Sequence, residues 1–433
     1  MKSILISNPV WGKLNCDNFC NFSLKSLLYN GNIPRLLNKY NVTLHILTKK
    51  DDLEYFKKNS NFKKIPKSVK IKFFFFSDNF FFSGKYSKVT KLQNVSIKES
   101  KNFDYLIFNY ADFIWSNNSL NNLMKEIKRT KVNFLSFFCL PVNHNKLKNF
   151  VRSKKVISQK QLSKFSAENL HREAKLRFWD DKTFTLTPTF IIFSLKSYGL
   201  LVSAYHQTIL VAAVNEDNQT LLKGIRGVTL DEYFSSILSR ENYHTVRNSS
   251  DVMVSAICDW KHNSAIPKKW SKEKSLKACF KRLNSSNRQL SEKIILFESK
   301  PMPKDDFKNK LVESASIIRH TNMKYGFNVI LHYFLTHPTF GPYVQIIYKA
   351  FELFYEIRGI YFKISNIVQA ILFISLYIYG NLINWSIYYI IVIVRLNSNS
   401  RKKIRKPKMF NIIKKYNILR RSKILVNKFL KII

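Results

Sequence analysis

Residues 102–120 read Asn-Phe-Asp-Tyr-Leu-Ile-Phe-Asn-Tyr-Ala-Asp-Phe-Ile-Trp-Ser-Asn-Asn-Ser-Leu. The apolar run at 105–108 predicts a short buried strand, and the polar residues at 116–119 offer N-caps for a helix that follows. Asp112 lies between the two. In an open α/β sheet, ligands bind beyond the carboxyl ends of the strands. A carboxylate there can bind a divalent cation that holds a diphosphate, or it can cap the following turn. We predict the first role for Asp112.

Alternating strands and helices surround this stretch over residues 1–150. Apolar runs bounded by turn residues predict further strands at 3–7, 42–47, 69–76 and 132–138. Helices are expected between them, and the Asp51-Asp52 pair is predicted to cap one. This alternation is typical of an α/β fold, so we predict a mostly parallel sheet with helices on both faces.

The composition indicates a globular chain with a strong positive charge. The 433 residues, 45% of them hydrophobic, can form about two to three structural units with sizeable cores. The net charge of +44 has two explanations, an AT-rich genome or an attraction to anionic partners such as phospholipid, nucleotide or nucleic acid. The five cysteines form no Cys-x-x-Cys pair, which favours a reducing, cytosolic compartment over a disulfide framework or a zinc site.

The pattern changes after residue 150. Ser158 and Gln161 have the spacing of a capping box, and the helix that they begin is predicted to run as far as Phe178. Residues 190–214 form a β-like block that contains His206 and is interrupted by Gly199. Residues 301–363 are expected to form a helical connector.

The last segment of the chain has the features of a membrane anchor. Residues 364–394 contain no charged side chain, and residues 398–433 contain thirteen Lys or Arg and no acid. About 20 apolar residues can span a bilayer, but Gly380, Asn381 and Asn384 divide the run. We therefore expect 364–433 to act as a monotopic or peripheral anchor on the cytoplasmic face, ending in a basic amphipathic tail. The alternative is a hydrophobic helical pair that packs on the domain or on another subunit.

Several strong catalytic signatures are absent from the sequence. It contains no G-x-x-x-x-G-K-[ST], G-x-G-x-x-G, G-x-S-x-G or H-E-x-x-H motif. These absences argue against P-loop NTPases, dinucleotide-dependent dehydrogenases, serine hydrolases and zincins. The nine histidines are scattered, which argues against a metal site built from histidine alone.

Short motifs recur at intervals along residues 4–260. They are Trp11-Gly12, Gly31-Asn32-x-Pro34, Ala111-Asp112-x-x-x-Ser116-x-x-Ser119-Leu120, Gly199-Leu200-Leu201-x-x-x-Tyr205-His206, Gly227-Val228-Thr229-Leu230-Asp231 and Val246-x-x-Ser249-x-Asp251. Taken together, this pattern resembles bacterial glycosyltransferase-like proteins of the GT-A type. The resemblance implies a GT-A/Rossmann-like fold, a nucleotide-sugar donor and a divalent metal, Mn²⁺ or Mg²⁺.

One departure from that family concerns the metal. GT-A enzymes usually carry Asp-x-Asp at the end of this strand, whereas this chain has no Asp-x-Asp and supplies Asp112 alone. Other ligands must then complete a metal site, or Lys and Arg neutralise the diphosphate instead.

The other candidate site residues each have a structural alternative. We expect Trp11 to stack on the donor base and Gly12 to let the backbone approach it, although both could serve packing alone. Asp231, His206 and Asp251 are the candidates to orient or deprotonate an acceptor hydroxyl. Asp231 could instead be an N-cap, His206 a buried core histidine and Asp251 a turn former.

These expectations combine into one functional hypothesis. Residues 1–150 would bind the nucleotide-sugar, residues 151–300 would face the acceptor, and the anchor would hold the enzyme at an anionic membrane surface. The acceptor would be a glycan or a lipid-linked precursor of a cell-surface polysaccharide. The first alternative is a non-catalytic peripheral membrane protein that binds anionic lipid. A nucleic-acid-binding protein is the second, but no recognisable nucleic-acid-binding motif supports specific binding.

Overall fold

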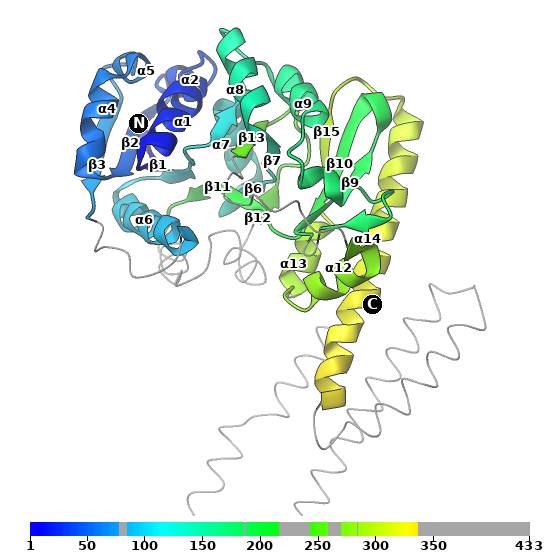
Figure 1. Ribbon diagram of the computed structural model, residues 1–433. Helices are drawn as coiled ribbons and strands as arrows, with labels where there is room; N and C mark the ends of the chain where they lie inside the picture. Colours follow the sequence, from blue (N-terminus) through cyan, green and yellow to red (C-terminus); the bar gives the residue numbers. More distant parts are fainter. Residues whose placement is uncertain (78–84, 186–187, 216–242, 259–269, 284, 337–433) are drawn as a thin grey trace, which may run out of the picture. The chain divides into compact units, whose positions relative to one another are not determined.

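The computed structural model describes residues 1–77, 85–185, 188–215, 243–258, 270–283 and 285–336 (Figure 1). The chain divides into two compact units, Met1–Tyr333 and Phe334–Ile433, and the second is described only at residues 334–336. The expected anchor at 364–433 and the later part of the expected connector 301–363 therefore lie outside the described residues. Within the described part, no helix combines the length and the apolar character needed to cross a membrane.

A seven-stranded sheet forms the centre of the first unit. Its strands, in spatial order, are β12 (Tyr243–Thr245), β6 (Phe134–Phe137), β11 (Thr208–Ala213), β4 (Tyr105–Phe108), β1 (Lys2–Pro9), β2 (Tyr40–Thr48) and β3 (Lys70–Phe75). All neighbouring pairs are parallel except the two that involve β11, which is antiparallel to both β4 and β6. The expected mostly parallel sheet is confirmed. Strands from both sides of residue 150 share it.

Helices cover both faces of this sheet, as the alternation of elements predicted. On β1, the side chains of Ile4 and Ile6 join one buried cluster and that of Leu5 joins another, because successive residues of a strand point to opposite faces. Three helical segments line the first face: a π-helical segment (Phe19–Ser23), α2 (Leu24–Leu27) and α7 (Ser119–Thr130). The second face is lined by α6 (Lys85–Glu99) and α13 (Ser285–Ser291), through Ile97 and Leu290.

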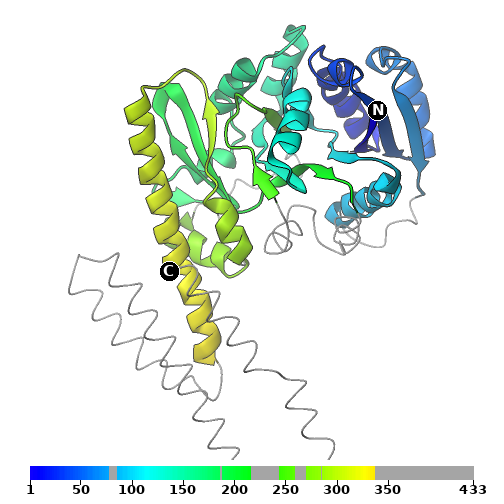
Figure 2. The same cartoon turned by 180° about the vertical axis from the view of Figure 1, so that it is seen from behind.

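Three smaller sheets complete the first unit. Their strands, in spatial order, are β5 (Phe113–Trp115), β13 (Val254–Cys258) and β7 (Leu140–Asn143) in one; β15 (Ile295–Glu298), β10 (Gly199–Ala204) and β9 (Phe190–Ser194) in another; and β14 (Trp270–Ser271) and β8 (Thr183–Phe184) in the third. The long helix α14 (Lys304–Thr336) runs beside β9 and β10 in both views (Figures 1 and 2). Its Ile318 and Tyr325 are buried in one cluster with Phe193 and Leu201 of those strands.

The remaining helices are short. They are α1 (Lys13–Asn18), α3 (Ile33–Leu36), α4 (Leu53–Lys58), α5 (Ser60–Lys63), α8 (His144–Ser153), α9 (Gln159–Glu168), α12 (Lys272–Phe280) and the 3-10 turns Lys50–Asp52, Ser100–Asn102, Ala174–Arg177 and Lys196–Tyr198. The capping box that begins α9 is confirmed, since Ser158 and Gln161 exchange both hydrogen bonds. The helix ends at Glu168, however, and not at Phe178. Leu170 pairs with Val142 in an isolated bridge, so strand-like pairing replaces the expected later turns of the helix.

Two motifs that are far apart in the sequence lock together in the fold. The Asn32 side chain is fully buried, and its Nδ2 donates to the carbonyl oxygens of Ser26 (2.9 Å) and Ser116 (3.0 Å). Its Oδ1 accepts from the backbone N–H of Leu120 at 3.0 Å, in the first turn of α7. A buried amide with three such bonds specifies where α7 begins relative to α3. The Gly31-Asn32 motif therefore has a structural role.

Burial of His45 should make the stability of the fold depend on pH. His45 lies on β2 with 1% of its surface exposed, and its Nδ1 is 3.0 Å from the Ser96 hydroxyl of α6. Burial lowers the pKa of His45 from 6.5 to about 4; the charge of Glu99 acts in the opposite direction and that of Lys72 in the same one. The unfolded state therefore binds more protons between these values, so stability falls as the pH drops below about 6.5. We expect a loss of about 2 kcal/mol in the free energy of unfolding between pH 7 and pH 5 from His45 alone.

Urea unfolding of the wild type and of His45→Gln at both pH values measures this contribution. The variant keeps a polar partner for Ser96 but cannot titrate, so its loss between pH 7 and pH 5 should be smaller by that amount. His171 and His244, whose pKa values burial also lowers, remain in both proteins and contribute to the residual pH dependence. Equal losses in the two proteins would contradict the prediction.

Candidate functional site

The carboxyl ends of β1 and β4 lie next to each other at the point where the strand order reverses. From β1 the sheet continues through β2 and β3 on one side, and through β4 on the other. Ser7 of β1 is in register with Phe108 of β4, so the residues after both strands leave the sheet at the same edge. In open α/β sheets the crevice outside such a switch point is where ligands bind. We call this boundary of the sheet the carboxyl edge.

The loop after β1 is held in place by an acid that follows β2. The Gly12 N–H donates to Oδ2 of Asp52 at 2.8 Å, and the Thr48 hydroxyl lies 3.4 Å from the same oxygen. Burial, and next the charge of Asp52, raise the pKa of the Cys16 thiol to about 12. Asp52 was expected to cap a helix, but its side chain makes no capping hydrogen bond. The Asp52 carboxylate positions the loop after β1 instead, through its hydrogen bond from the Gly12 N–H.

Trp11 and Gly12 themselves occupy the carboxyl edge. Gly12 has φ +75°, a conformation that favours glycine, and a Cβ there would meet no atom within 4 Å. Trp11 is half-buried, and its ring contacts Phe76 edge to face at 5.8 Å between centroids. The tryptophan thus packs on one side and keeps exposed surface. Whether that surface contacts a donor base stays a prediction.

A buried polar network fixes the residues after β1 and β4 to each other. Nδ2 of Asn109 donates to Oδ1 of Asn8 at 2.8 Å and lies 3.2 Å from the Ser23 hydroxyl. The indole N–H of Trp115 donates to Oδ1 of Asn109 at 2.8 Å. Asn8, Asn109 and Trp115 are all fully buried. Satisfied networks of this kind are rigid, so the two loops are held in one arrangement.

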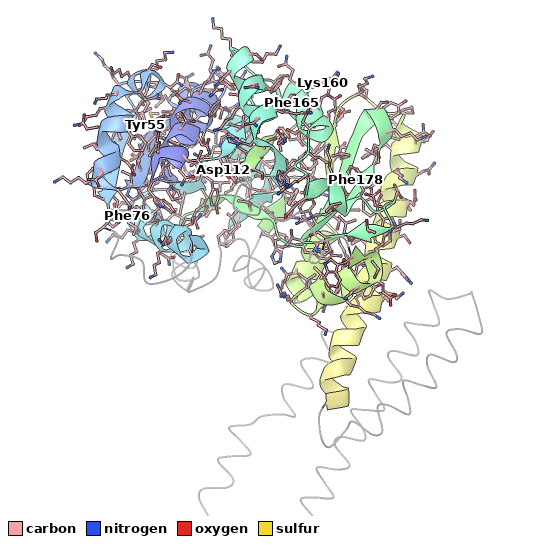
Figure 3. All side chains as sticks on the ribbon, viewed as in Figure 1. Tyr55, Phe76, Asp112, Lys160, Phe165 and Phe178 are labelled. Carbon is pink, nitrogen blue, oxygen red and sulfur yellow. The ribbon has the colours of Figure 1, made fainter. Side chains whose placement is uncertain are left out.

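Asp112 lies in the loop that this network anchors (Figure 3). Tyr110 lies two positions before Asp112, and its hydroxyl accepts a hydrogen bond from Nε2 of Gln93 at 2.8 Å. Its ring packs on that of Phe113, with 4.7 Å between the ring centroids. Asp112 is half-buried, and its carbonyl oxygen accepts from the N–H of Ile257 at 2.8 Å. This backbone bond places Asp112 at the end of the β5–β13 ladder, in the loop that follows β4.

The three predicted catalytic residues have different positions. His206 precedes β11, whose first residue, Thr208, pairs with Phe137 at the end of β6, so His206 lies at the carboxyl edge. Its Nδ1 is 3.4 Å from Nδ2 of Asn287. Asp251 lies near the opposite end of the β5–β13 ladder from Asp112, where its carbonyl oxygen accepts from Asn122. The ladder alone separates the two ends by about 10 Å. Asp231 lies outside the described residues.

Arg177 is a buried charged residue that the sequence analysis missed, and Phe190 lies between it and the end of β6. Arg177 is 8% exposed, and its guanidinium carbon lies 4.1 Å from the ring centroid of Phe190, which packs on Phe138 just after β6. Burial lowers its pKa to about 10. One nitrogen donates to the Thr189 hydroxyl at 2.7 Å, while its Nε has no hydrogen-bond partner and no described carboxylate forms an ion pair with it. A buried cation of this kind favours an anionic ligand. The sequence gives no sign that sets Arg177 apart from the other Lys and Arg residues, and only its burial in the fold does so.

The described residues do not form a metal site by themselves. No group of three or more His, Cys, Asp or Glu side chains is placed to bind an ion within the described ranges. Asp112 offers one carboxylate, and Asp52 already accepts the Gly12 N–H. The high pKa of Cys16 also keeps that thiol protonated and so a poor ligand. A site of this composition does not fit a metal held by protein ligands alone.

Comparisons with known proteins give distant structural similarities. No family model matches the chain. No curated protein matches it in sequence. Among solved structures, TarS from S. aureus has a TM-score of 0.32 at 10% identity, covering 76% of this chain; the chain spans 54% of TarS. TarS 1-349 in complex with UDP-GlcNAc has a TM-score of 0.30 at 13% identity, covering 67% of this chain and 71% of that one.

A mammalian structure is also similar. The apo form of mouse xyloside xylosyltransferase 1 has a TM-score of 0.24 at 11% identity, covering 35% of this chain and 58% of that one. TM-scores of this size do not establish a common fold, so no residue of this chain takes a role from these structures.

Proposed function

We propose that the chain is a glycosyltransferase of the GT-A type, which moves a sugar from a nucleotide-sugar donor to a glycan or a lipid-linked acceptor. The observation that carries this proposal is the carboxyl edge. The Trp11-Gly12 loop and the Asp112 loop leave adjacent strands there, at the switch point of the sheet. The motif resemblance in the sequence points to the same chemistry, and two of its motifs come from these loops.

Each element of the edge has a proposed part in donor binding. The exposed side of Trp11 would stack on the donor base, and Gly12 would let the backbone approach it. Asp112 would act on the diphosphate end, together with a Mn²⁺ or Mg²⁺ ion that arrives with the donor, since Mg²⁺ is commonly held by one or two carboxylates and substrate phosphates. Arg177 would help neutralise the diphosphate, because it is buried and no carboxylate of the described residues forms an ion pair with it.

The transfer itself needs a base for the acceptor. As the acceptor hydroxyl oxygen bonds to the anomeric carbon, the carbon–oxygen bond to the diphosphate breaks, and the hydroxyl proton passes to the base. His206 is the described candidate, because it lies at the carboxyl edge. Asp231 is the alternative outside the described residues. Asp251 is not beside Asp112, so a catalytic role for it would require a different site.

The proposed location is the cytoplasmic face of the membrane. Its support is the uncharged run at 364–394 followed by the basic tail at 398–433. A lipid-linked acceptor or growing cell-surface polysaccharide would explain such an anchor. The main rival is a non-catalytic peripheral protein that uses the same segment to bind anionic lipid.

A thermal-shift screen of the full chain tests the proposal. UDP-, GDP-, CMP- and dTDP-sugars are added with and without Mn²⁺. A donor present at 100 times its Kd should stabilise the protein by about 2.7 kcal/mol, which shifts the melting temperature by several degrees. A response to one nucleotide class and not to the others supports a donor site. A flat response to every donor, with binding to anionic vesicles, would favour the peripheral membrane protein.

A further inference from the structure

A second polar depression lies away from the carboxyl edge, where the turn before α3 meets the first turns of α7 and α9. It is a shallow depression open to solvent, with a volume of about 470 Å³. Its lining consists of one glycine, six side-chain amides and two cations, and none of these residues is acidic. We call it the asparagine pocket. It lies at the far end of β5 from Asp112, because Asn117 and Asn118 follow that strand and Asp112 precedes it.

The floor of the asparagine pocket is held rigidly. The Gly31 N–H donates to Oδ1 of Asn117 at 2.8 Å, and the Asn117 N–H donates to the carbonyl oxygen of Ile157 at 2.7 Å. A Cβ at Gly31 would lie 2.0 Å from Oδ1 of Asn118, so a larger residue there would displace the Asn118 side chain. Asn118 itself has φ 69°, a left-handed conformation that costs free energy and recurs at binding sites. The pocket is therefore preformed, which reduces the cost of binding.

Most amides of the pocket have hydrogen-bonding capacity to spare. Within the described residues, the side chains of Asn30, Asn118, Asn121 and Gln159 make no hydrogen bond, whereas Nδ2 of Asn122 donates to the carbonyl oxygen of Asp251. Each amide offers both a donor and an acceptor at adjacent atoms. Vicinal hydroxyl groups of a sugar ring present the same alternation of donor and acceptor. Four such amides in one depression therefore suit a hydroxyl-rich ligand.

The charge of the pocket is positive. Arg35 and Lys125 are exposed, and neither forms an ion pair with a carboxylate that the structure describes. Both α7 and α9 begin at the pocket, and neither has an acidic residue in its first turn. Helix N-termini carry a partial positive charge that acids in the first turn would normally compensate. The ligand should therefore carry a negative group.

We propose that the asparagine pocket binds an anionic glycan. Its ring hydroxyls would contact the free amides, and its carboxylate or phosphate would lie between Arg35 and Lys125. The site does not depend on the proposed transferase activity, because it shares no residue with the carboxyl edge and its test uses no donor. In a transferase it would hold part of a polymeric acceptor at a distance from the reacting end.

Isothermal titration calorimetry on the full chain at 150 mM NaCl tests this binding. The three probes are trigalacturonic acid, maltotriose phosphorylated at carbon 6 and plain maltotriose. The two anionic probes separate a carboxylate from a phosphate ligand, and maltotriose reports the contribution of hydroxyls alone. We expect at least one anionic probe to bind, and maltotriose to bind at least tenfold more weakly than it.

Variants locate the binding and exclude general attraction to a basic protein. The double variant Arg35→Ala with Lys125→Ala should lower the affinity for the anionic probe about tenfold or more. Asn121→Ala should lower it about fivefold. The matched control removes two exposed lysines elsewhere, through Lys146→Ala and Lys308→Ala, and should change binding less than twofold. All these side chains lie at the surface, so thermal melts should be unchanged. Equal weakening by the control pair, equal binding of maltotriose, or no binding of any probe below 1 mM would overturn the proposal.

Discussion

Replacing Asp112 with asparagine should slow transfer at least 10²-fold and leave the fold intact. The amide has nearly the same shape, so the backbone bond from Ile257 and the loop anchored by Asn109 should persist. It lacks the negative charge on which the proposed contact with a donor-bound cation depends. Loss of one preorganised electrostatic contact typically lowers kcat by about 10² to 10³. We therefore expect a fall of at least 10²-fold in turnover with the donor that the screen identifies, and a smaller donor-induced thermal shift.

Asp104, next to the other end of β4, provides a matched control. It precedes β4, at the opposite end from Asp112, and its Oδ2 accepts from the backbone N–H and the hydroxyl of Ser3 at 2.7 and 3.0 Å. Those bonds lower its pKa. Asp104→Asn should therefore cost about 1 kcal/mol of stability without changing turnover. If Asp112→Asn retained the activity and donor response of the wild type, the proposed role of the carboxyl edge would be wrong.

Replacing Gly199 with alanine should have the largest effect on stability. Gly199 has φ +136°, and a Cβ there would lie 2.0 Å from the carbonyl oxygen of Phe297. That oxygen belongs to β15, which pairs with β10 through Gly199 and Glu298, so it cannot move away without breaking the ladder. Backbone strain and overpacking each cost about 1 to 3 kcal/mol, so we expect a loss of about 3 to 5 kcal/mol. Urea unfolding measures it, and failure to accumulate folded protein would agree with it.

The variant Gly12→Ala separates the destabilisation due to backbone strain from that due to overpacking. Gly12 also has a positive φ, of +75°, but a Cβ there meets no atom within 4 Å. Only the backbone strain applies, because Gly12 combines φ 75° with ψ 151°, so this variant should lose about 1 to 3 kcal/mol of stability. The prediction for Gly199 fails if its alanine variant is no less stable than that of Gly12.

The main elements of the sheet could be predicted because their signals are local. The apolar run at 105–108 became β4, and that at 42–47 lies within β2. The capping box at Ser158 and Gln161 likewise depends on residues three positions apart. The end of α9 could not be predicted, because Leu170 leaves the helix to pair with Val142, far away in the sequence.

The candidate site was predictable only in part. That Asp112 follows a buried strand can be read from the neighbouring residues alone. The contact of Asp52 with Gly12 and the burial of Arg177 both depend on segments that are distant in the sequence. The asparagine pocket likewise forms only because the Gly31 turn lies against the start of α7.

The sequence by itself determined most strands of the central sheet and the start of α9, since hydrophobic periodicity and capping residues act over a few positions. Tertiary structure alone decided that β11 enters the sheet antiparallel between β4 and β6, and that Asp112 and Asp251 lie at opposite ends of one ladder. Strand pairing depends on which apolar faces can be buried together. That burial joins residues more than 70 positions apart, so no local sequence pattern can predict it.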